Sequence, residues 1–358
     1  MKIEIVLKRT QSIRRQLRKK GIDCLILTKP VDVTYVTAFS GEDSWAAITK
    51  SATYLITDSR YIEQAQKECV RTAIIERKGL IAQAAGTLVR RLGSVHTVAV
   101  EKSISLAAYQ ELKKSMSAPL RTVAGVLEEE RSIKDTTERA SIQAAADIAA
   151  VALEKAARFF KQGITENELA GILNLEMRRL GCRNGFETIV AFGANASRPH
   201  HQPTHRKLKQ RDTILIDFGA RYKGYCCDIT RCFAVGKPTA AYRRAYEVVE
   251  RAQAAAIKIA RAGALLSEVD AAPRKVIRDS GLPVYGHGSG HGFGLEIHEI
   301  PFLKEDAKGR LQAGQIITIE PGIYLPGKLG VRVEDDILIT EDGCRILTHK
   351  CPHAPWRA

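Results

Sequence analysis

Residues 213–233 read TILIDFGARYKGYCCDITRCF, two strand-like runs joined by the short segment RYKG. A tight turn at this segment would fold the two runs into an antiparallel hairpin. If Tyr222 and Lys223 form the tip of the turn, Asp217 pairs directly with Asp228, although a bulge would change this register. Directly opposed side chains share a face, with Cβ atoms about 5 Å apart. Two carboxylates that close repel each other unless they are protonated or bridged by a cation.

A second hairpin is predicted in IITIEPGIYLPGKLGVRVEDD (316–336), with PGKLG as its turn, centred near Gly327. This register sets Glu320 opposite Glu334. The two hairpins together supply an Asp pair and a Glu pair on either side of a histidine-rich segment. Four carboxylates and an imidazole carry more negative charge than one divalent cation neutralises. The composition therefore suits two adjacent Mn²⁺, Fe²⁺, Co²⁺ or Zn²⁺ ions that share carboxylate ligands.

The histidine-rich segment is GHGSGHGFGLEIHE (286–299), with three histidines and five glycines. A phosphate-binding loop needs the spacing GxGxxG, or a glycine loop closed by Lys and Ser/Thr, and neither is present. The DFG sequence at 217–219 is not accompanied by the catalytic or phosphate loops of a protein kinase. A single strand Asp beside a Gly is commonly solvated, and Glu334-Asp335-Asp336 alone would be an acidic surface patch. The combination of both hairpins with the histidines favours a metal site.

The length of 358 residues predicts two domains. From about residue 23 to 125, short apolar runs such as DCLILT and TYLITD alternate with helical stretches, which is typical of a compact α/β unit. Beyond Arg131 the pattern changes. Two capping boxes, Asp135 with Glu138 and Thr165 with Glu168, open successive helices, the first of them ending near Gly163. We expect an α/β domain at 1–128 and an α+β domain at 129–358.

The composition, 45% apolar and 27% charged, is that of an ordinary globular protein. The chain has no apolar run long enough for a transmembrane helix, so no membrane association is expected. The N-terminus lacks the features of a signal peptide, and the cytoplasm is the expected location. Eight cysteines without a CxxC pair are expected to be reduced and mostly buried.

The net charge is +15, and eight of the positive charges fall in the first twenty residues. A basic segment of this kind can attract nucleic acid. However, RTQSIRRQLRKKG (9–21) also has the pattern of an amphipathic surface helix, with Ile13 and Leu17 four residues apart. No nucleic-acid recognition motif accompanies it, and we expect no nucleic-acid partner.

Five residues in these motifs resemble the ligand set of the pita-bread metallopeptidases. They are Asp217 in DFG, Asp228 in GYCCDITR, His291 in HGSGHGFGLEIHE, Glu320 in EPGIY and Glu334 in GVRVEDD. The chain is more narrowly similar to the Xaa-Pro branch of that family, aminopeptidase P and prolidase. RRQLRKKGIDCLILTKPVDVTYVTAFSG (14–41) and ITDSRYIEQAQKE (56–68) resemble the amino-terminal domain that this branch shares with creatinase. Cys227, Cys232 and Ser289 depart from the usual residues, and none of them stands at a ligand position of the family.

The resemblance implies a pita-bread catalytic domain preceded by a smaller creatinase-type α/β domain, and a site with two divalent metal ions. Manganese is the first expectation, with cobalt, zinc and iron as alternatives. Asp217 would bind one ion, His291 and Glu320 the other, and Asp228 and Glu334 both. The expected substrates are proline-containing peptides, and the expected assembly is a homodimer.

The resemblance also implies catalytic roles. Glu320 would carry a proton from the attacking water to the leaving nitrogen. His200, in NASRPHHQPTH (195–205), and His298 would bind substrate and donate hydrogen bonds to the developing oxyanion. Arg332 would support the carboxylates or the substrate. His287 is either a residue that orients the ligands or a packed histidine. His201 and His205 are expected at the surface.

Several functions compete for these motifs. A methionine aminopeptidase has the same ligand order, but the amino-terminal domain of about 130 residues and the VEDD ending argue against it. A creatinase-like amidinohydrolase lacks the metal ligands, and a non-catalytic binding protein does not require them. In several prolidases an Arg follows the HExP segment, whereas Phe302 follows HEIP here. We therefore expect an Xaa-Pro aminopeptidase, with an Xaa-Pro dipeptidase as the alternative if Arg198 or Arg332 substitutes for the missing Arg.

Overall fold

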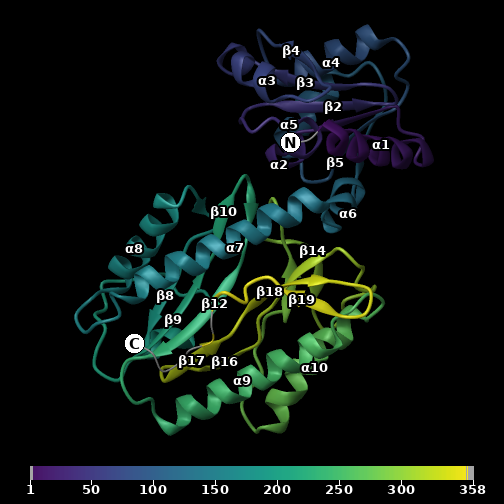
Figure 1. Cartoon of the computed structure of the whole chain (residues 1–358). Helices are drawn as coiled ribbons and strands as arrows, with labels where there is room; N and C mark the ends of the chain where they lie inside the picture. The colour runs from purple at the N-terminus through teal and green to yellow at the C-terminus, as the bar shows by residue number, and fades with distance from the viewer. Residues whose placement is uncertain (1–2, 352, 354–358) are drawn as a thin grey trace. The chain divides into compact units, whose positions relative to one another are not determined.

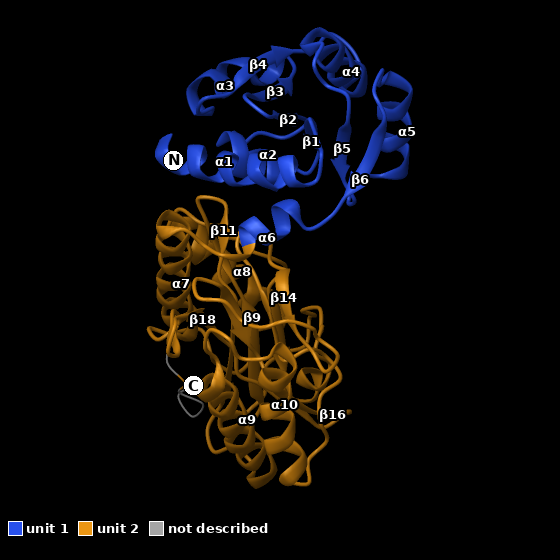
Figure 2. Ribbon diagram, turned by 90° about the vertical axis from the view of Figure 1, so that its right-hand side faces the viewer, with its two compact units in different colours: residues 1–131 blue, residues 132–358 orange. Residues whose placement is uncertain are grey.

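The computed structural model describes residues 3–351 and 353, and it divides into two compact units, Met1–Arg131 and Ser132–Ala358 (Figure 2). The boundary expected between residues 128 and 129 falls within α6 (Val126–Ser132). Within the described residues, no helix has the length and apolar character needed to cross a bilayer. The eight cysteines form no disulfide in this structure, and six of them are buried, which confirms the expectation that most of the thiols are buried.

Unit 1 is built on a six-stranded sheet in the order β4-β3-β2-β1-β5-β6. The strands are β1 (Cys24–Leu27), β2 (Trp45–Thr49), β3 (Thr53–Thr57), β4 (Ala73–Glu76), β5 (Val98–Glu101) and β6 (Leu120–Val123). The helices are α1 (Ile3–Lys19), α2 (Pro30–Thr37), α3 (Ile62–Glu68), α4 (Ile81–Leu92) and α5 (Leu106–Ser115), with the 3₁₀ turn η1 (Ser59–Tyr61). The amphipathic helix predicted near the N-terminus is α1, whose Ile13 and Leu17 are buried.

Unit 2 contains two helix pairs with strands between them (Figure 1). The helices are α7 (Thr136–Ala157), α8 (Glu166–Arg179), α9 (Ala240–Ile259) and α10 (Leu266–Asp279). The first pair packs on β8 (Ile189–Phe192), β9 (Thr213–Phe218) and β12 (Ile229–Ala234). The second pair packs on strands that include β15 (Ile316–Ile319) and β18 (Asp335–Ile339). The remaining elements are β7 (Arg183–Asn184), η2 (Gly193–Ser197), β10 (Ala220–Tyr222), β11 (Tyr225–Cys226), β13 (Gly290–Gly292), β14 (Glu299–Leu303), β16 (Gly322–Leu325), β17 (Leu329–Arg332) and β19 (Cys344–Ile346).

The two predicted capping boxes are both present. Asp135 caps α7 with Glu138, and Thr165 caps α8 with Glu168. Each pair satisfies backbone N–H groups that the first helical turn leaves without partners. Helix α7 ends at Ala157, earlier than the predicted end near Gly163.

The first hairpin forms, but its predicted register was wrong. Tyr222 pairs with Tyr225, so Lys223 and Gly224 form the tip, and Asp217 pairs with Thr230 rather than with Asp228. Both tip residues have positive φ, 49° and 88°, as a two-residue type I′ turn requires, and Gly accepts this conformation without strain. The error is two residues, and side chains alternate faces with period two. Asp217 and Asp228 therefore still belong to the same face.

The second hairpin has the predicted register. Gly322 pairs with Arg332 and Leu325 with Leu329, around a turn that contains Gly327 at φ 68°. The outer ladder continues the same register, with Ile319 opposite Asp335. Glu320 and Glu334 lie between the two ladders. The turn thus sets two glutamates from distant parts of the sequence against each other.

Candidate metal centre

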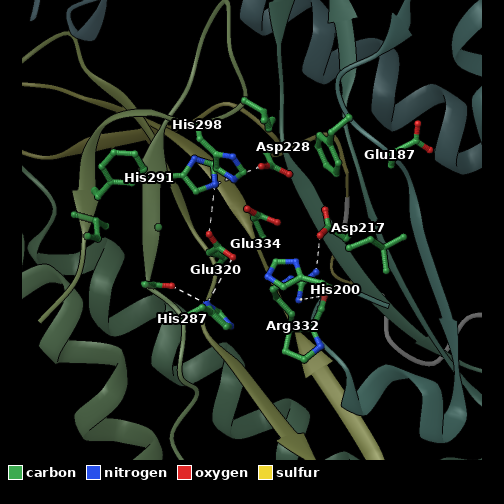
Figure 3. A pocket seen from close by; sticks show the side chains of 18 of the residues that line it. Glu187, His200, Asp217, Asp228, His287, His291, His298, Glu320, Arg332 and Glu334 are labelled. Carbon is green, nitrogen blue, oxygen red and sulfur yellow. Dashed lines mark hydrogen bonds and ion pairs between the residues drawn. The ribbon is translucent and has the colours of Figure 1, made fainter. Parts of the chain in front are cut away.

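A cavity of about 700 Å³ lies in unit 2 (Figure 3). Every residue predicted for the site lines it. These residues are His200, Asp217, Asp228, His291, His298, Glu320, Arg332 and Glu334. They come from separate segments: the loop after η2, the two hairpins, β13 and the loop that leads into β14. The sheets of unit 2 therefore bring together side chains that are up to 134 positions apart, between His200 and Glu334.

Three of these side chains form a compact group. Asp228, His291 and Glu334 are buried, and one oxygen or nitrogen atom from each lies within 4.8 Å of the others. The Nε2 atom of His291 is 3.7 Å from Asp228 Oδ2 and 3.5 Å from Glu320 Oε1. These separations exceed hydrogen-bonding distance. Charged and neutral donor atoms thus converge on one point without bonding to one another, which is the arrangement that a bound cation needs.

Asp217 lies apart from this group, and one of its oxygens has no partner. Its Oδ2 accepts a hydrogen bond of 2.5 Å from Nη2 of Arg332. Its Oδ1 is buried and has no hydrogen-bond partner among the described residues. A buried carboxylate oxygen without a partner is costly. A cation bound at Oδ1 would remove that cost, so this atom fits a metal-ligand role.

The electrostatics of the cluster point the same way. Burial, followed by repulsion from Glu334 and Asp217, raises the pKa of Asp228 well above its usual value. Burial, followed by repulsion from Glu320 and Asp217, also raises the pKa of Glu334 well above its usual value. Burial lowers the pKa of His291 to about 4, so this imidazole is neutral, as metal ligation requires. Divalent cations would relieve the carboxylate repulsion, and the oxygen and nitrogen donors suit Mn, Fe, Co or Zn.

Arg332 links the carboxylates to one another. It is 3% exposed, and besides Asp217 it donates to Thr230 Oγ1 at 3.0 Å through Nε. That hydroxyl in turn donates to Glu334 Oε2 at 2.6 Å. Nη1 of Arg332 donates to the hydroxyl of Tyr324 at 2.9 Å. Arg332 therefore supports the carboxylate network, one of the two roles that the sequence left open for it.

His287 is held from several sides. Its ring stacks on Tyr285 at 4.7 Å between centroids, and its Nε2 lies 3.1 Å from the Tyr324 hydroxyl. Arg274 of α10 donates to the carbonyl of His287 at 2.6 Å and forms an ion pair with Asp270 one turn away. Burial lowers the pKa of His287 to about 4. Tyr324 thus joins His287 to the Arg332 network. No motif in the sequence indicates this Tyr324 contact.

The two predicted substrate histidines both face the cavity. The rings of His298 and His291 lie edge to face, with centroids 4.5 Å apart, and burial lowers the pKa of His298. Figure 3 shows His200 between Asp217 and Arg332. The surface position predicted for the neighbouring His201 was wrong. His201 is 4% exposed, and its Nε2 lies 2.9 Å from Oε2 of the fully buried Glu166.

Comparison with known proteins gives a match for each unit. Residues 140–341 match metallopeptidase family M24, and residues 9–133 match the creatinase/prolidase N-terminal domain. An uncharacterized peptidase of Bacillus subtilis, YqhT, is 37% identical over 342 residues, covering 95% of this chain and 97% of the relative. The Xaa-Pro dipeptidase from Bacillus anthracis superposes with a TM-score of 0.94 at 35% identity, covering 98% of this chain and 99% of the other. The X-Pro aminopeptidase from Thermotoga maritima superposes with a TM-score of 0.89 at 33% identity, covering 96% and 99%.

Proposed function

Because the chain belongs to metallopeptidase family M24, we propose that it hydrolyses the Xaa-Pro bond at the amino end of proline-containing peptides. Membership of the family and the predicted fold class, a creatinase-type domain followed by a pita-bread domain, are confirmed by the two matches and by the superpositions. The Xaa-Pro bond is proposed because the similar structures include both Xaa-Pro dipeptidases and an X-Pro aminopeptidase.

The proposed ligands are those expected from the sequence: Asp217, Asp228, His291, Glu320 and Glu334. Bound at these side chains, two divalent cations, manganese first, would lower the pKa of a water molecule so that it can attack at neutral pH. The free Oδ1 of Asp217 and the convergent atoms of Asp228, His291 and Glu334 support this assignment. Dialysis against a chelator, followed by metal analysis after addition of Mn²⁺, tests the number of ions bound.

The protein side chains supply proton transfer and orientation. We assign Glu320 to accept the proton of the attacking water and to deliver it to the proline nitrogen, which leaves poorly unless it is protonated. His200 and His298 would donate hydrogen bonds to the oxygen that becomes negative in the transition state. The lowered pKa of His298 supports a neutral ring, which carries one N–H donor.

Phe302 is the observation that favours peptides longer than a dipeptide. This residue of β14 lines the cavity, and 43% of its surface is exposed. An apolar ring at this position can contact a residue that follows proline, but it cannot bind a free carboxylate. We therefore propose the Xaa-Pro aminopeptidase activity as the main one.

Lys304 favours the second candidate, an Xaa-Pro dipeptidase. It also lines the cavity, two residues beyond Phe302, and forms a 3.3 Å ion pair with Asp306 in which both side chains are largely exposed. Its ammonium group could pair with the carboxylate of an Xaa-Pro dipeptide. The match to the dipeptidase from Bacillus anthracis is consistent with this alternative.

One assay separates these activities. The Mn²⁺-loaded protein is offered Ala-Pro-Ala, Ala-Pro and Ala-Ala-Ala at equal concentration. We expect cleavage of Ala-Pro-Ala before proline and little cleavage of Ala-Ala-Ala. Rapid hydrolysis of Ala-Ala-Ala would refute the preference for proline, and exclusive hydrolysis of Ala-Pro would establish the dipeptidase instead.

Lys304→Met adds a test of carboxylate recognition. An exposed charge pair contributes about 0.2–1 kcal/mol, so its loss should raise KM by up to about fivefold. If KM rises for Ala-Pro and stays unchanged for Ala-Pro-Ala, the result favours the dipeptidase. The control is Lys308→Met, which changes an exposed lysine nearby that does not line the cavity.

The homodimer and the cytoplasmic location expected from the sequence stay predictions. Light scattering on the purified protein tests whether it is a dimer.

A further inference from the structure

His200 lies in a segment whose backbone is not held by a sheet. Between η2, which ends at Ser197, and β9, which begins at Thr213, residues 198–205 belong to no helix or strand. A histidine that must donate to a developing charge has to be held within a few tenths of an ångström. Backbone hydrogen bonds from Arg198 to Asn195, from His201 to Arg198 and from Asn167 to Thr204 shape this segment, and side chains supply further contacts.

Glu166, the first residue of α8, provides most of these contacts. Its side chain is fully buried. Oε1 accepts hydrogen bonds of 2.8 Å from the backbone N–H of Phe192 and from the side-chain amide of Asn195. Oε2 accepts from the backbone N–H and the hydroxyl of Thr204, at 3.0 and 2.6 Å, and lies 2.9 Å from Nε2 of His201. One carboxylate thus binds both ends of the segment that carries His200.

The charge of Glu166 is suited to this position. Burial raises the pKa of Glu166, but hydrogen bonds from His201, Thr204 and Asn195 outweigh this effect, and the net shift is downward. The carboxylate therefore stays ionised at neutral pH. Its place at the N-terminus of α8 adds the favourable interaction of an anion with the helix dipole.

The residues on both sides of His200 are fixed. The carbonyl of Pro199, which precedes it, accepts a hydrogen bond of 3.3 Å from Nη1 of Arg332. The ring of His201, which follows it, contacts Glu166. The His200 side chain projects into the cavity from between these two contacts (Figure 3). Arg332 fixes the segment relative to the carboxylates of the metal centre, and Glu166 fixes it relative to α8.

We propose that Glu166 is a positioning residue that holds His200 in the orientation needed for hydrolysis. The proposal rests on the function proposed above. Glu166 does not line the cavity, so it acts through the His200 segment and not on the substrate. Exchange of its carboxylate for an amide removes the charge and turns an N–H₂ group toward groups that donate hydrogen bonds.

The first experiment compares Glu166→Gln with Glu168→Gln. Both changes remove one negative charge from the first turn of α8, but Glu168 is exposed and its side chain accepts hydrogen bonds from Thr165 in the capping box. Misplacement of a catalytic group by about 1 Å can cost on the order of 100-fold in rate. We expect Glu166→Gln to lower kcat by 10- to 100-fold, with KM and metal content unchanged, and Glu168→Gln to stay near wild type. Equal effects of the two changes would overturn the proposal.

The second experiment is a double-mutant cycle with His200→Ala. If Glu166 acts through His200, Glu166→Gln should lower kcat by less than about threefold in the His200→Ala background. Losses that multiply would show that Glu166 acts by another route, and the proposal would fail. If Glu166→Gln does not fold, Asn195→Ala removes one donor and leaves the carboxylate in place. It should show a smaller loss with the same non-additivity.

A third measurement does not depend on activity. Nitrogen-15 NMR of labelled histidine rings should show changed His200 signals in Glu166→Gln, whereas the His298 signals stay in place. Unchanged His200 signals would overturn the proposal even if kcat falls. Failure of the wild-type protein to cleave any Xaa-Pro peptide would refute the proposed function alone, because the NMR comparison would still test the position of His200.

Discussion

Arg332→Met should destabilise unit 2 strongly in the absence of metal and much less in its presence. The substitution keeps most of the side-chain volume but removes the charge that faces Asp217. The Oδ1 atom of Asp217 already has no partner among residues 3–351 and 353, and Oδ2 would lose its 2.5 Å hydrogen bond. The metal-free variant would therefore contain a buried carboxylate without a compensating group.

The size of the effect follows from burial. The side chains of Arg332 and Asp217 are 4% and 13% exposed. Removal of one partner from a buried pair costs roughly 3–5 kcal/mol. The hydrogen bonds from Arg332 to Thr230 and Tyr324 are also lost. In chelator we therefore expect the free energy of unfolding to fall by an amount near the upper end of this range. A cation bound at Asp217 would compensate its charge, and about half of the loss should then disappear.

The measurement is urea unfolding, followed by circular dichroism, with chelator and with excess Mn²⁺. The control is Arg206→Met, which breaks a partly exposed pair with Asp212 in the same unit and should cost no more than about 1 kcal/mol in either condition. Asp217→Asn combined with Arg332→Met should recover part of the stability in chelator, because neither partner is then left charged.

Two results would refute this reasoning. A loss of equal size with and without Mn²⁺ would mean that no cation compensates Asp217. A loss in chelator no greater than that of Arg206→Met would mean that the buried ion pair contributes little to folding.

Three further predictions concern the residues of the cavity and the hairpin that carries Asp217 and Asp228. His200→Ala and His298→Ala should each lower kcat by about 10²–10³, the usual effect of losing one oxyanion donor; metal analysis should find the ions still bound, and their loss would make the residue a ligand instead. Asp228→Asn should bind less Mn²⁺ than the wild type in equilibrium dialysis, and an unchanged amount would remove Asp228 from the ligand set. Gly219→Ala should lower the thermal unfolding midpoint or prevent folding, because its Cβ would lie 2.0 Å from the Cys227 carbonyl oxygen; an unchanged midpoint would contradict this.

The composition of the site could be predicted from the sequence because the two hairpins alternate side chains regularly. The turn PGKLG allows one reading of the second hairpin, and that reading was right. In the segment RYKG more than one pair of residues can form the turn. The pair that does so is Lys223 and Gly224, which both have positive φ. The site prediction survived this error because a shift of two residues preserves the face. A shift of one residue would have turned Asp217 and Asp228 to opposite faces.

The contacts that orient the site were harder to predict. Tyr324 and Arg274 contact His287 through a hydroxyl and through a backbone carbonyl. Neither contact leaves a periodic pattern in the sequence, because each depends on how α10 and β16 pack against the histidine segment. Residue type and spacing indicate which groups can bind a metal, but the tertiary packing decides how they are held.

His200 and His201 illustrate this limit, since two adjacent histidines in an irregular segment look equivalent in sequence. The available signal lay elsewhere, in α8. Thr165 and Glu168 satisfy the capping box, which leaves Glu166 without a capping role. Glu166 also precedes the buried Leu169 and Leu173 by three and seven positions, on the apolar face of the helix. A carboxylate on a buried face needs hydrogen-bond donors, and the neighbouring polar loop supplies them through His201 and Thr204.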